Sequence, residues 1–172
     1  TYPRMTAEDA VQILDGALSA YDKGRGEWPS CGYGKRINTM RRFTAELGKY
    51  RDRIIRSLIW EIAKTTADAK TEFDRTIDYL EQTCVVYEEM FVKPIRTRSS
   101  GIATSTKPGP IGVGLCMGPS NYPHNELWTS AGPMLLAGNC VIIKHAKAGI
   151  LLNKYVQEAA EAVFPKGTVN FL

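Results

Sequence analysis

The stretch that decides the fold runs Lys107-Pro-Gly-Pro-Ile-Gly-Val-Gly-Leu-Cys-Met-Gly-Pro-Ser-Asn-Tyr-Pro-His124 and later closes with Gly138-Asn-Cys-Val-Ile-Ile-Lys-His-Ala-Lys147. It contains two short apolar runs, Val113–Met117 and Cys140–Ile143, each followed by polar or turn residues. Such runs are typical of strands that are buried on both faces of a parallel sheet. The span between them has room for one helix, so we predict a βαβ unit with parallel strands.

The polar residues that follow these two runs are predicted to lie together. In open parallel sheets, ligands bind beyond the carboxyl ends of the strands. Both polar clusters, Gly118–Asn121 and Lys144–Lys147, follow a predicted strand directly. We therefore expect the two clusters to face one crevice.

The residues before this unit are predicted to be helical. Thr6 can cap a first helix while Asp9 reaches back to it, and two glycines stop that helix near Lys23–Gly26. Its apolar residues recur at helical spacing: Ala7, Ala10, Val11, Leu14, Leu18 and Tyr21. Trp28–Gly34 is interpreted as a loop.

Three more helices are predicted to begin near Lys35, Tyr50 and Thr66. The second of these has a buried side made of Ile54, Ile55, Leu58, Ile59 and Ile62. The third carries a one-sided stripe made of Phe73, Ile77, Leu80, Cys84, Tyr87 and Phe91. Such stripes usually serve helix packing and not cofactor binding.

The segment from Pro94 to Pro110 changes character. It is rich in β-branched and small residues and has a turn signal at Ser99-Ser100-Gly101, which predicts a hairpin outside the main sheet. The alternative is a plain linker. A hairpin with an exposed edge would tend to pair with another chain.

A last helix is predicted after Gly149, and a third strand begins at Thr168. The helix has an apolar stripe made of Leu152, Val156, Ala159 and Val163. A βαβαβ series is half of a nucleotide-binding sheet. The fold class is therefore α/β, with N-terminal helices packed on the first part of a Rossmann-like parallel sheet. Since a closing strand lacks a helix to cover it, we expect a truncated domain.

Composition narrows the function classes. The chain has 172 residues, a net charge of +4 and no apolar run of membrane-spanning length. We see no secretory signal, and the cysteines (Cys31, Cys84, Cys116 and Cys140) form no close pair. Reduced thiols in a cytoplasmic protein are therefore expected, with no membrane partner.

A basic span from Lys35 to Arg56 holds eight basic and two acidic residues. It could be a nucleic-acid patch. We favour the solvated face of two amphipathic helices, because no nucleic-acid-binding motif is present. No nucleic-acid partner is expected.

Asn121 is the strongest candidate for chemistry. The usual dinucleotide fingerprint is absent, because Gly112-Val-Gly114 lies at the start of a strand and not after one. Asn121 instead lies between two prolines that constrain the loop, and its amide can donate two hydrogen bonds, as an oxyanion hole requires. The alternative is that Asn121 caps the following helix.

The other polar candidates are weaker from chemistry alone. Lys144 could hold a ribose or phosphate, or it could simply meet solvent at a strand end. His124 and His145 have no further ligand at metal spacing, so no metal is expected. Cys116 and Cys140 lie within apolar strands without an activating base, which indicates structural thiols.

Several segments together resemble the aldehyde dehydrogenase superfamily. They are Pro110-Ile-Gly-Val113, Gly118-Pro-Ser-Asn-Tyr-Pro123, Ala137-Gly-Asn-Cys-Val-Ile-Ile-Lys144, Glu61-Ile-Ala-Lys64 with Ala69, Glu72 and Phe73, and Phe164-Pro-Lys-Gly-Thr-Val-Asn-Phe171. The Asn-Tyr-Pro form is similar to the branch of non-phosphorylating glyceraldehyde-3-phosphate dehydrogenases. The resemblance covers essentially the whole chain and implies an N-terminal helical region (1–93), a hairpin or oligomerisation segment (94–109) and the first part of an NAD(P)-binding domain (110–172).

The resemblance also implies roles for particular residues. Asn121 would be the oxyanion asparagine, which polarises the aldehyde carbonyl and holds the charged oxygen of the thiohemiacetal. The cofactor would lie along Met117, Gly118, Pro119, Ser120, Lys144, His145, Ala146 and Lys147. Ser120 stands where an aromatic residue is usual, and His145 where proline is common. NAD-using members commonly carry glutamate where this chain has Lys147, so NADP is expected in preference to NAD.

By the same resemblance, the nucleophilic cysteine and general-base glutamate would lie beyond Leu172. The chain itself is then expected to be inactive, as the N-terminal fragment of an enzyme that oxidises a small aldehyde and forms a homo-oligomer, a dimer or tetramer. One alternative is a non-catalytic assembly module with a vestigial nucleotide site. Another is a basic helical domain that binds nucleic acid.

Overall fold

The protein, a computed structural model, is described over residues 4–93, 95–107 and 109–172. Its first helix, α1 (Ala7–Tyr21), begins as predicted. The Thr6 hydroxyl accepts the Asp9 N–H at 3.2 Å, and the Asp9 carboxylate accepts the Thr6 N–H at 2.7 Å. This reciprocal capping box satisfies two N–H groups that a helix start leaves free. A 3₁₀ turn, η1 (Asp22–Gly24), ends the helix.

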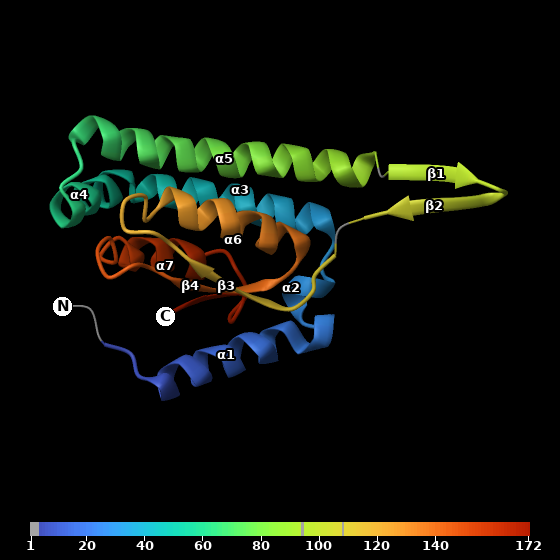
Figure 1. The fold of residues 1–172 in the computed structure, drawn as a ribbon, viewed down its shortest axis with the longest axis horizontal. Helices are drawn as coiled ribbons and strands as arrows, with labels where there is room; N and C mark the ends of the chain where they lie inside the picture. The colour runs from blue at the N-terminus through green and yellow to red at the C-terminus, as the bar shows by residue number, and fades with distance from the viewer. Residues whose placement is uncertain (1–3, 94, 108) are drawn as a thin grey trace.

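Four helices follow α1: α2 (Glu27–Ser30), α3 (Tyr33–Lys49), α4 (Arg51–Ile62) and α5 (Thr66–Val92). The last three form a layer of their own, whereas α2 lies near α1 (Figure 1). α3 and α5 lie side by side along the molecule (Figure 1). Phe43 of α3 and Leu80 of α5 are fully buried, and both lie against α6, Phe43 at Trp128 and Leu80 at Gly132. Leu80 belongs to the stripe predicted for α5. The predicted starts of α4 and α5 are confirmed within one residue.

The prediction of a loop over Trp28–Gly34 is wrong. Glu27–Ser30 is a turn of helix, and Tyr33 already belongs to α3. The reason is tertiary: the Trp28 indole is buried and donates its N–H to the Leu135 carbonyl at 3.1 Å. A short polar segment with two glycines carries too little local pattern to reveal such an anchor.

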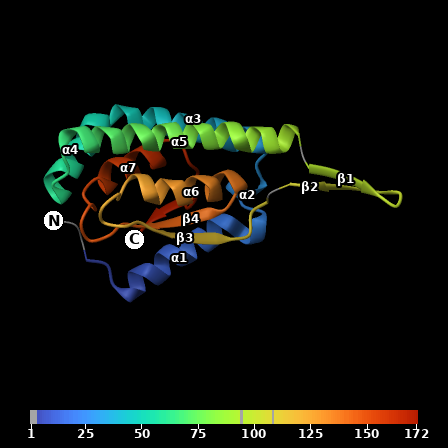
Figure 2. The same ribbon diagram turned by 45° about the horizontal axis from the view of Figure 1, so that its top comes forward.

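The predicted hairpin is confirmed within the described residues. Strands β1 (Ile95–Ser99) and β2 (Ile102–Thr106) pair antiparallel, with Ser99 opposite Ile102. Ser100 and Gly101 form the turn with φ of 51° and 81°. The hairpin projects away from the rest of the molecule in both views (Figures 1 and 2). Pro94, where the predicted segment begins, and Pro108, within it, lie outside the described residues.

The remaining elements form the predicted βαβαβ unit: β3 (Val113–Met117), α6 (Asn125–Ala137), β4 (Cys140–Lys144), α7 (Asn153–Glu161) and β5 (Val169–Phe171). The strands pair in parallel in the order β3-β4-β5. The helices α6 and α7 lie between the sheet and the α3/α5 layer, whereas α1 lies on the opposite face (Figures 1 and 2).

Burial on both faces holds for β4 but not for β3. Cys140, Val141 and Ile143 are fully buried, because α6 and α1 cover the two faces there. In β3, however, Leu115 is 54% exposed and Met117 is 69% exposed. α1 covers this face incompletely, and its own apolar residues Val11, Leu14 and Leu18 are exposed by at least 41%. Part of the apolar run of β3 is therefore left exposed by the described residues.

Cations of the basic span make contacts within the molecule. Arg51 forms a bidentate pair with Asp74, and Arg41 lies 3.2 Å from Glu88. Arg36 is buried and donates to the Leu136 carbonyl at 2.7 Å and to the Cys31 carbonyl at 2.5 Å. The guanidinium thus meets the carbonyl end of α6, where a helix leaves acceptors free. These contacts favour a structural role for the span.

Candidate functional site

The ends of β3 and β4 lie side by side, as predicted. Met117 and Lys144 are register partners, and the Gly118 N–H donates to the Lys144 carbonyl at 3.1 Å. The chain leaves both strands at the same edge of the sheet. We use the name first loop for Gly118–His124 and second loop for His145–Leu152. The candidate residues therefore come from neighbouring segments of the fold.

Asn121 lies at the exposed bend of the first loop. The alternative that it caps α6 is wrong, because the N-cap of that helix is His124 and no side-chain cap bond is formed there. Its side-chain amide is therefore not consumed by the start of α6. The exposed Pro119 and Ser120 precede it in the same loop, and the strand residue Met117 is exposed as well.

The N–H groups at the start of α6 are satisfied by a carboxylate from α5. One oxygen of Glu72 accepts the backbone N–H of His124 at 3.0 Å and that of Asn125 at 3.1 Å. Its other oxygen accepts from the ammonium of Lys64. The Glu72 side chain is wholly buried and that of Lys64 is 11% exposed. A charge-assisted cap of this kind holds the first loop against the helical region.

Lys64 also faces the ring of Tyr122, which follows Asn121. Its ammonium lies 3.8 Å from the ring centroid, and the guanidinium carbon of Arg75 lies 5.5 Å from it. Cations are attracted to the face of an aromatic ring. Tyr122 is therefore held between two cations from outside the sheet domain, which restricts the backbone of its neighbour Asn121.

The second loop is held in the same manner by Glu61 of α4. Its two carboxylate oxygens accept the backbone N–H groups of Ile150 at 3.0 Å and Leu151 at 2.8 Å. In the sequence, Glu61 and Glu72 stand out only as members of the segments that resemble the family, and their role in holding the loops was not predicted. A glutamate inside an apolar helical stripe, such as Glu72 next to Phe73, is the sequence signal for a buried role.

The two loops also contact each other through Gly149 and Pro123. Gly149 has φ of 90°, and a Cβ built on it would lie 2.6 Å from Pro123 Cβ and Cγ. Both the left-handed conformation and the close contact require glycine at this position. The second loop therefore packs directly on the first.

Lys144 and Lys147 are exposed at this edge, and they supply the positive charge that an anionic cofactor requires. The ring of His145, by contrast, is only 3% exposed and is turned inward. Its expected contact with cofactor therefore cannot come from the imidazole. His124 is fully buried as well.

No group of three or more potential metal-ligating side chains occurs within residues 4–93, 95–107 and 109–172. The cysteines behave as structural thiols. Cys84, Cys116 and Cys140 are buried, and burial raises the pKa of both Cys84 and Cys140 to about 11. A thiol with such a pKa is a poor nucleophile at neutral pH.

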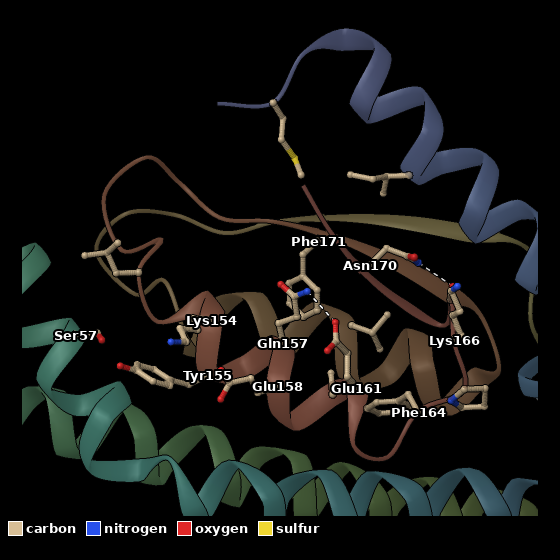
Figure 3. A pocket seen from close by; sticks show the side chains of 17 residues that line it. Ser57, Lys154, Tyr155, Gln157, Glu158, Glu161, Phe164, Lys166, Asn170 and Phe171 are labelled. Atoms are coloured by element: carbon tan, nitrogen blue, oxygen red, sulfur yellow. Dashed lines mark hydrogen bonds between the residues drawn. The ribbon is translucent and has the colours of Figure 1, made fainter. Parts of the chain in front are cut away.

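A large cavity of about 1170 Å³ lies between α7, β5 and the N-terminal segment (Figure 3). It adjoins the second loop at Leu151. Its wall on α7 carries both Lys154 and the hydrogen-bonded pair Gln157–Glu161, at 2.8 Å. Charges of both signs line it, so the cavity has no clear preference for an anion or a cation.

In the part of the chain that is described, no helix is both long and apolar enough to span a membrane.

Comparison with known proteins agrees with this geometry. The model of the aldehyde dehydrogenase family matches residues 1–172. The NADP-dependent glyceraldehyde-3-phosphate dehydrogenase of Triticum aestivum is 28% identical over 96% of this chain and 34% of its own length. This chain therefore spans about a third of the length of that relative.

Solved structures show the same fold. The NADP complex of NADP-dependent glyceraldehyde-3-phosphate dehydrogenase from Bacillus halodurans superposes with a TM-score of 0.87 at 24% identity, over 99% of this chain and 36% of that one. A betaine aldehyde dehydrogenase variant from Staphylococcus aureus, in complex with NAD+, superposes with a TM-score of 0.86 at 23% identity. The match covers 97% of this chain and 33% of that one. The predicted α/β architecture is thereby confirmed.

Proposed function

The chain belongs to the aldehyde dehydrogenase family, and from this premise we propose that it is the N-terminal part of an enzyme that oxidises an aldehyde with NADP. The observation that carries this proposal is the hydrogen bond between Gly118 and Lys144, which joins the strand ends at one edge. The Asn121 loop and the lysine loop both start there. That edge is where open parallel sheets bind nucleotides.

The residues of this edge fit a dinucleotide. A phosphate or ribose needs cations and hydrogen-bond donors, and Lys144 and Lys147 are exposed beside the first loop. Gly118 is closely packed, since a Cβ there would lie 3.1 Å from a Leu127 methyl carbon. A larger residue would push the loop away from the sheet. The cofactor, when bound, accepts the hydride from the substrate.

In the proposed reaction, a cysteine thiolate from outside this chain attacks the aldehyde carbon. The carbonyl oxygen then becomes negative, and we assign the Asn121 amide to donate a hydrogen bond to it. The same donor would serve the later step in which water releases the acid. The contacts of Glu72 and Tyr122 anchor the loop that carries this amide, which limits the backbone rearrangement needed during the reaction.

The preference for NADP is assigned to Lys147. An ammonium at that position attracts a 2′-phosphate, whereas a carboxylate would repel it. The wheat relative is described as NADP-dependent, and the Bacillus halodurans structure holds NADP. NAD remains the alternative cofactor, since the Staphylococcus aureus structure holds NAD+.

The test uses the longer protein that contains this chain. Asn121→Ala is expected to lower kcat about 10²- to 10³-fold, with little change in the KM for NADP. Asn121→Gln, which keeps an amide but moves it by one methylene, should lose nearly as much. An unchanged kcat in both variants would exclude the oxyanion role. The chain alone should show no aldehyde oxidation.

A second candidate is an assembly module that no longer binds nucleotide. The projecting hairpin favours it, because the described side chains from Thr97 to Lys107 are all exposed and a free strand edge invites pairing. In the enzyme, we assign the same hairpin to homo-oligomer formation in the cytoplasm. Titration of the longer protein with NADP separates the two candidates: saturable binding supports the enzyme, and its absence supports the module.

A further inference from the structure

The two loops enclose both histidines of the chain, the only two it has. His124 is the residue before α6 and is 0% exposed, and His145 follows β4 and is 3% exposed. None of their four ring nitrogens has a hydrogen-bond partner among the described residues. Buried polar atoms are normally paired, so two unpaired imidazoles at one place call for an explanation.

The surroundings of the His124 ring are those of an apolar packing group. The His124 ring stacks on Phe73 with centroids 5.6 Å apart and an angle of 13° between the planes. The contact of Pro123 with Gly149 closes the loops beside it. A neutral imidazole in such a place fills space between the first loop, the second loop and α5.

A protonated imidazole would find no anion there. The Glu72 carboxylate contacts the backbone of His124, but its oxygens already bind Lys64 and two backbone N–H groups. Glu61 is likewise occupied by the N–H groups of Ile150 and Leu151. Lys147 of the second loop is a cation, as is Lys144 at the end of β4.

From these contacts we propose that His124 and His145 form a neutral imidazole pair that packs the first loop onto the second, and that protonation of the pair separates the loops. The two residues are positioning residues and touch no substrate. A buried cation without a partner is costly, and a second one beside it adds repulsion. In acid, once the pair takes up protons, the loops should therefore part before the rest of the fold is lost.

The direction of the pKa shifts supports this. Burial lowers the pKa of His124 to about 3, with a further contribution from His145. Burial alone lowers that of His145 to about 4. A base whose folded pKa lies below its unfolded value stabilises the fold above the unfolded value. That stabilisation falls away as the pH drops below about 6.5 toward the folded values.

The first test is an NMR titration of the unmodified chain, in which two histidines give two ring signals. Both rings are expected to keep neutral chemical shifts at pH 5.5 in the folded chain. At lower pH the Gly118 and Ile150 amide signals should shift together with the imidazoles, as their loop contacts break. A ring that titrates near pH 6.5 without moving these amides would overturn the proposal.

The second test measures urea unfolding at pH 7.5 and pH 5.0. Each buried neutral histidine should raise the unfolding equilibrium constant about 30-fold over this interval, given an unfolded pKa of about 6.5. The double variant His124→Leu/His145→Leu, which keeps similar volume, should lose most of this dependence. An undiminished dependence in the variant would overturn the proposal. If the variant does not fold, the titration of the unmodified chain decides.

This proposal depends on the proposed function only for the statement that the two loops bind a cofactor. Both experiments observe the loops and the fold without any cofactor, so their failure leaves the dehydrogenase assignment untouched. Conversely, a longer protein that fails to bind NADP could still show the imidazole pair.

Discussion

The carboxylate of Glu72 on α5 accepts the backbone N–H of His124 at 3.0 Å, although 52 residues separate the two in the chain. A helix of the N-terminal region thereby fixes the start of α6 and the loop that carries Asn121. The candidate site is consequently built by two regions of the chain, and its geometry depends on contacts from outside the sheet domain.

Replacing Glu72 should be strongly destabilising. Glu72→Ala would leave the largely buried Lys64 ammonium and two backbone N–H groups without their partner, and breaking a buried pair from one side costs about 3–5 kcal/mol. Urea denaturation at pH 7 measures the loss. The control is Glu88→Ala, whose side chain is 48% exposed and pairs with Arg41; it should cost about 1 kcal/mol or less. Similar losses in both variants would contradict the assigned cap.

Two glycines should respond to alanine in opposite directions. Gly149→Ala meets both an unfavourable φ and Pro123 atoms at 2.6 Å, so the free energy of unfolding should fall by about 1–3 kcal/mol. Gly16 lies inside α1 with nothing within 4 Å of its built Cβ. Gly16→Ala should therefore raise stability by about 0.5–1 kcal/mol. Thermal unfolding of both variants measures the difference, and a Gly149→Ala variant that loses no stability would refute the close loop contact.

Thiol reactivity should divide the cysteines into two classes. Cys84, Cys116 and Cys140 are buried, and burial raises the pKa of each thiol. At pH 8 a thiol of pKa about 11 has a thiolate fraction of about 10⁻³. In the folded chain one thiol, the half-buried Cys31, should react quickly with a disulfide reagent, and all four should react in guanidinium. Rapid labelling of Cys140 in the folded chain would show that the sheet is more open than described.

Lys147→Glu should weaken the preference for NADP in the longer protein. Removing a charged hydrogen bond to the 2′-phosphate costs about 1.5–3 kcal/mol, so the ratio of kcat/KM for NADP to that for NAD should fall about 10- to 100-fold. The control, Lys70→Glu, changes charge equally on the exposed surface of α5 and should leave the ratio unaltered. If the ratio is unchanged in Lys147→Glu, residues other than Lys147 must select the cofactor.

The elements of the fold were predictable because their signals are local. The Thr6–Asp9 cap, the apolar run of β4 and the stripe of α5 each lie within a few turns or residues of chain, and each element formed where predicted. The parallel pairing of β3 and β4 followed from the helix between them. The hairpin was likewise predictable from its Ser100-Gly101 turn.

The predictions that the structure contradicts were wrong for a common physical reason: each depends on contacts with distant parts of the chain. α2 was missed because Trp28 is held by a carbonyl 107 residues away, and β3 was expected to be buried because an apolar run does not say how much of the chain will cover it. The burial of His145 was missed as well, because the family resemblance placed this residue along the cofactor and no local pattern shows that its ring is buried.

The sequence by itself determined the order of helices and strands, the edge of the sheet where the candidate residues gather and the resemblance to a family. Periodicity, capping and turn residues act over short distances in the chain, so they can be read without coordinates. Only the tertiary structure decided that Glu61 and Glu72 hold the two loops and that His124 and His145 lie buried between them. Those contacts join residues far apart in the chain, and side-chain burial emerges only when whole layers pack together.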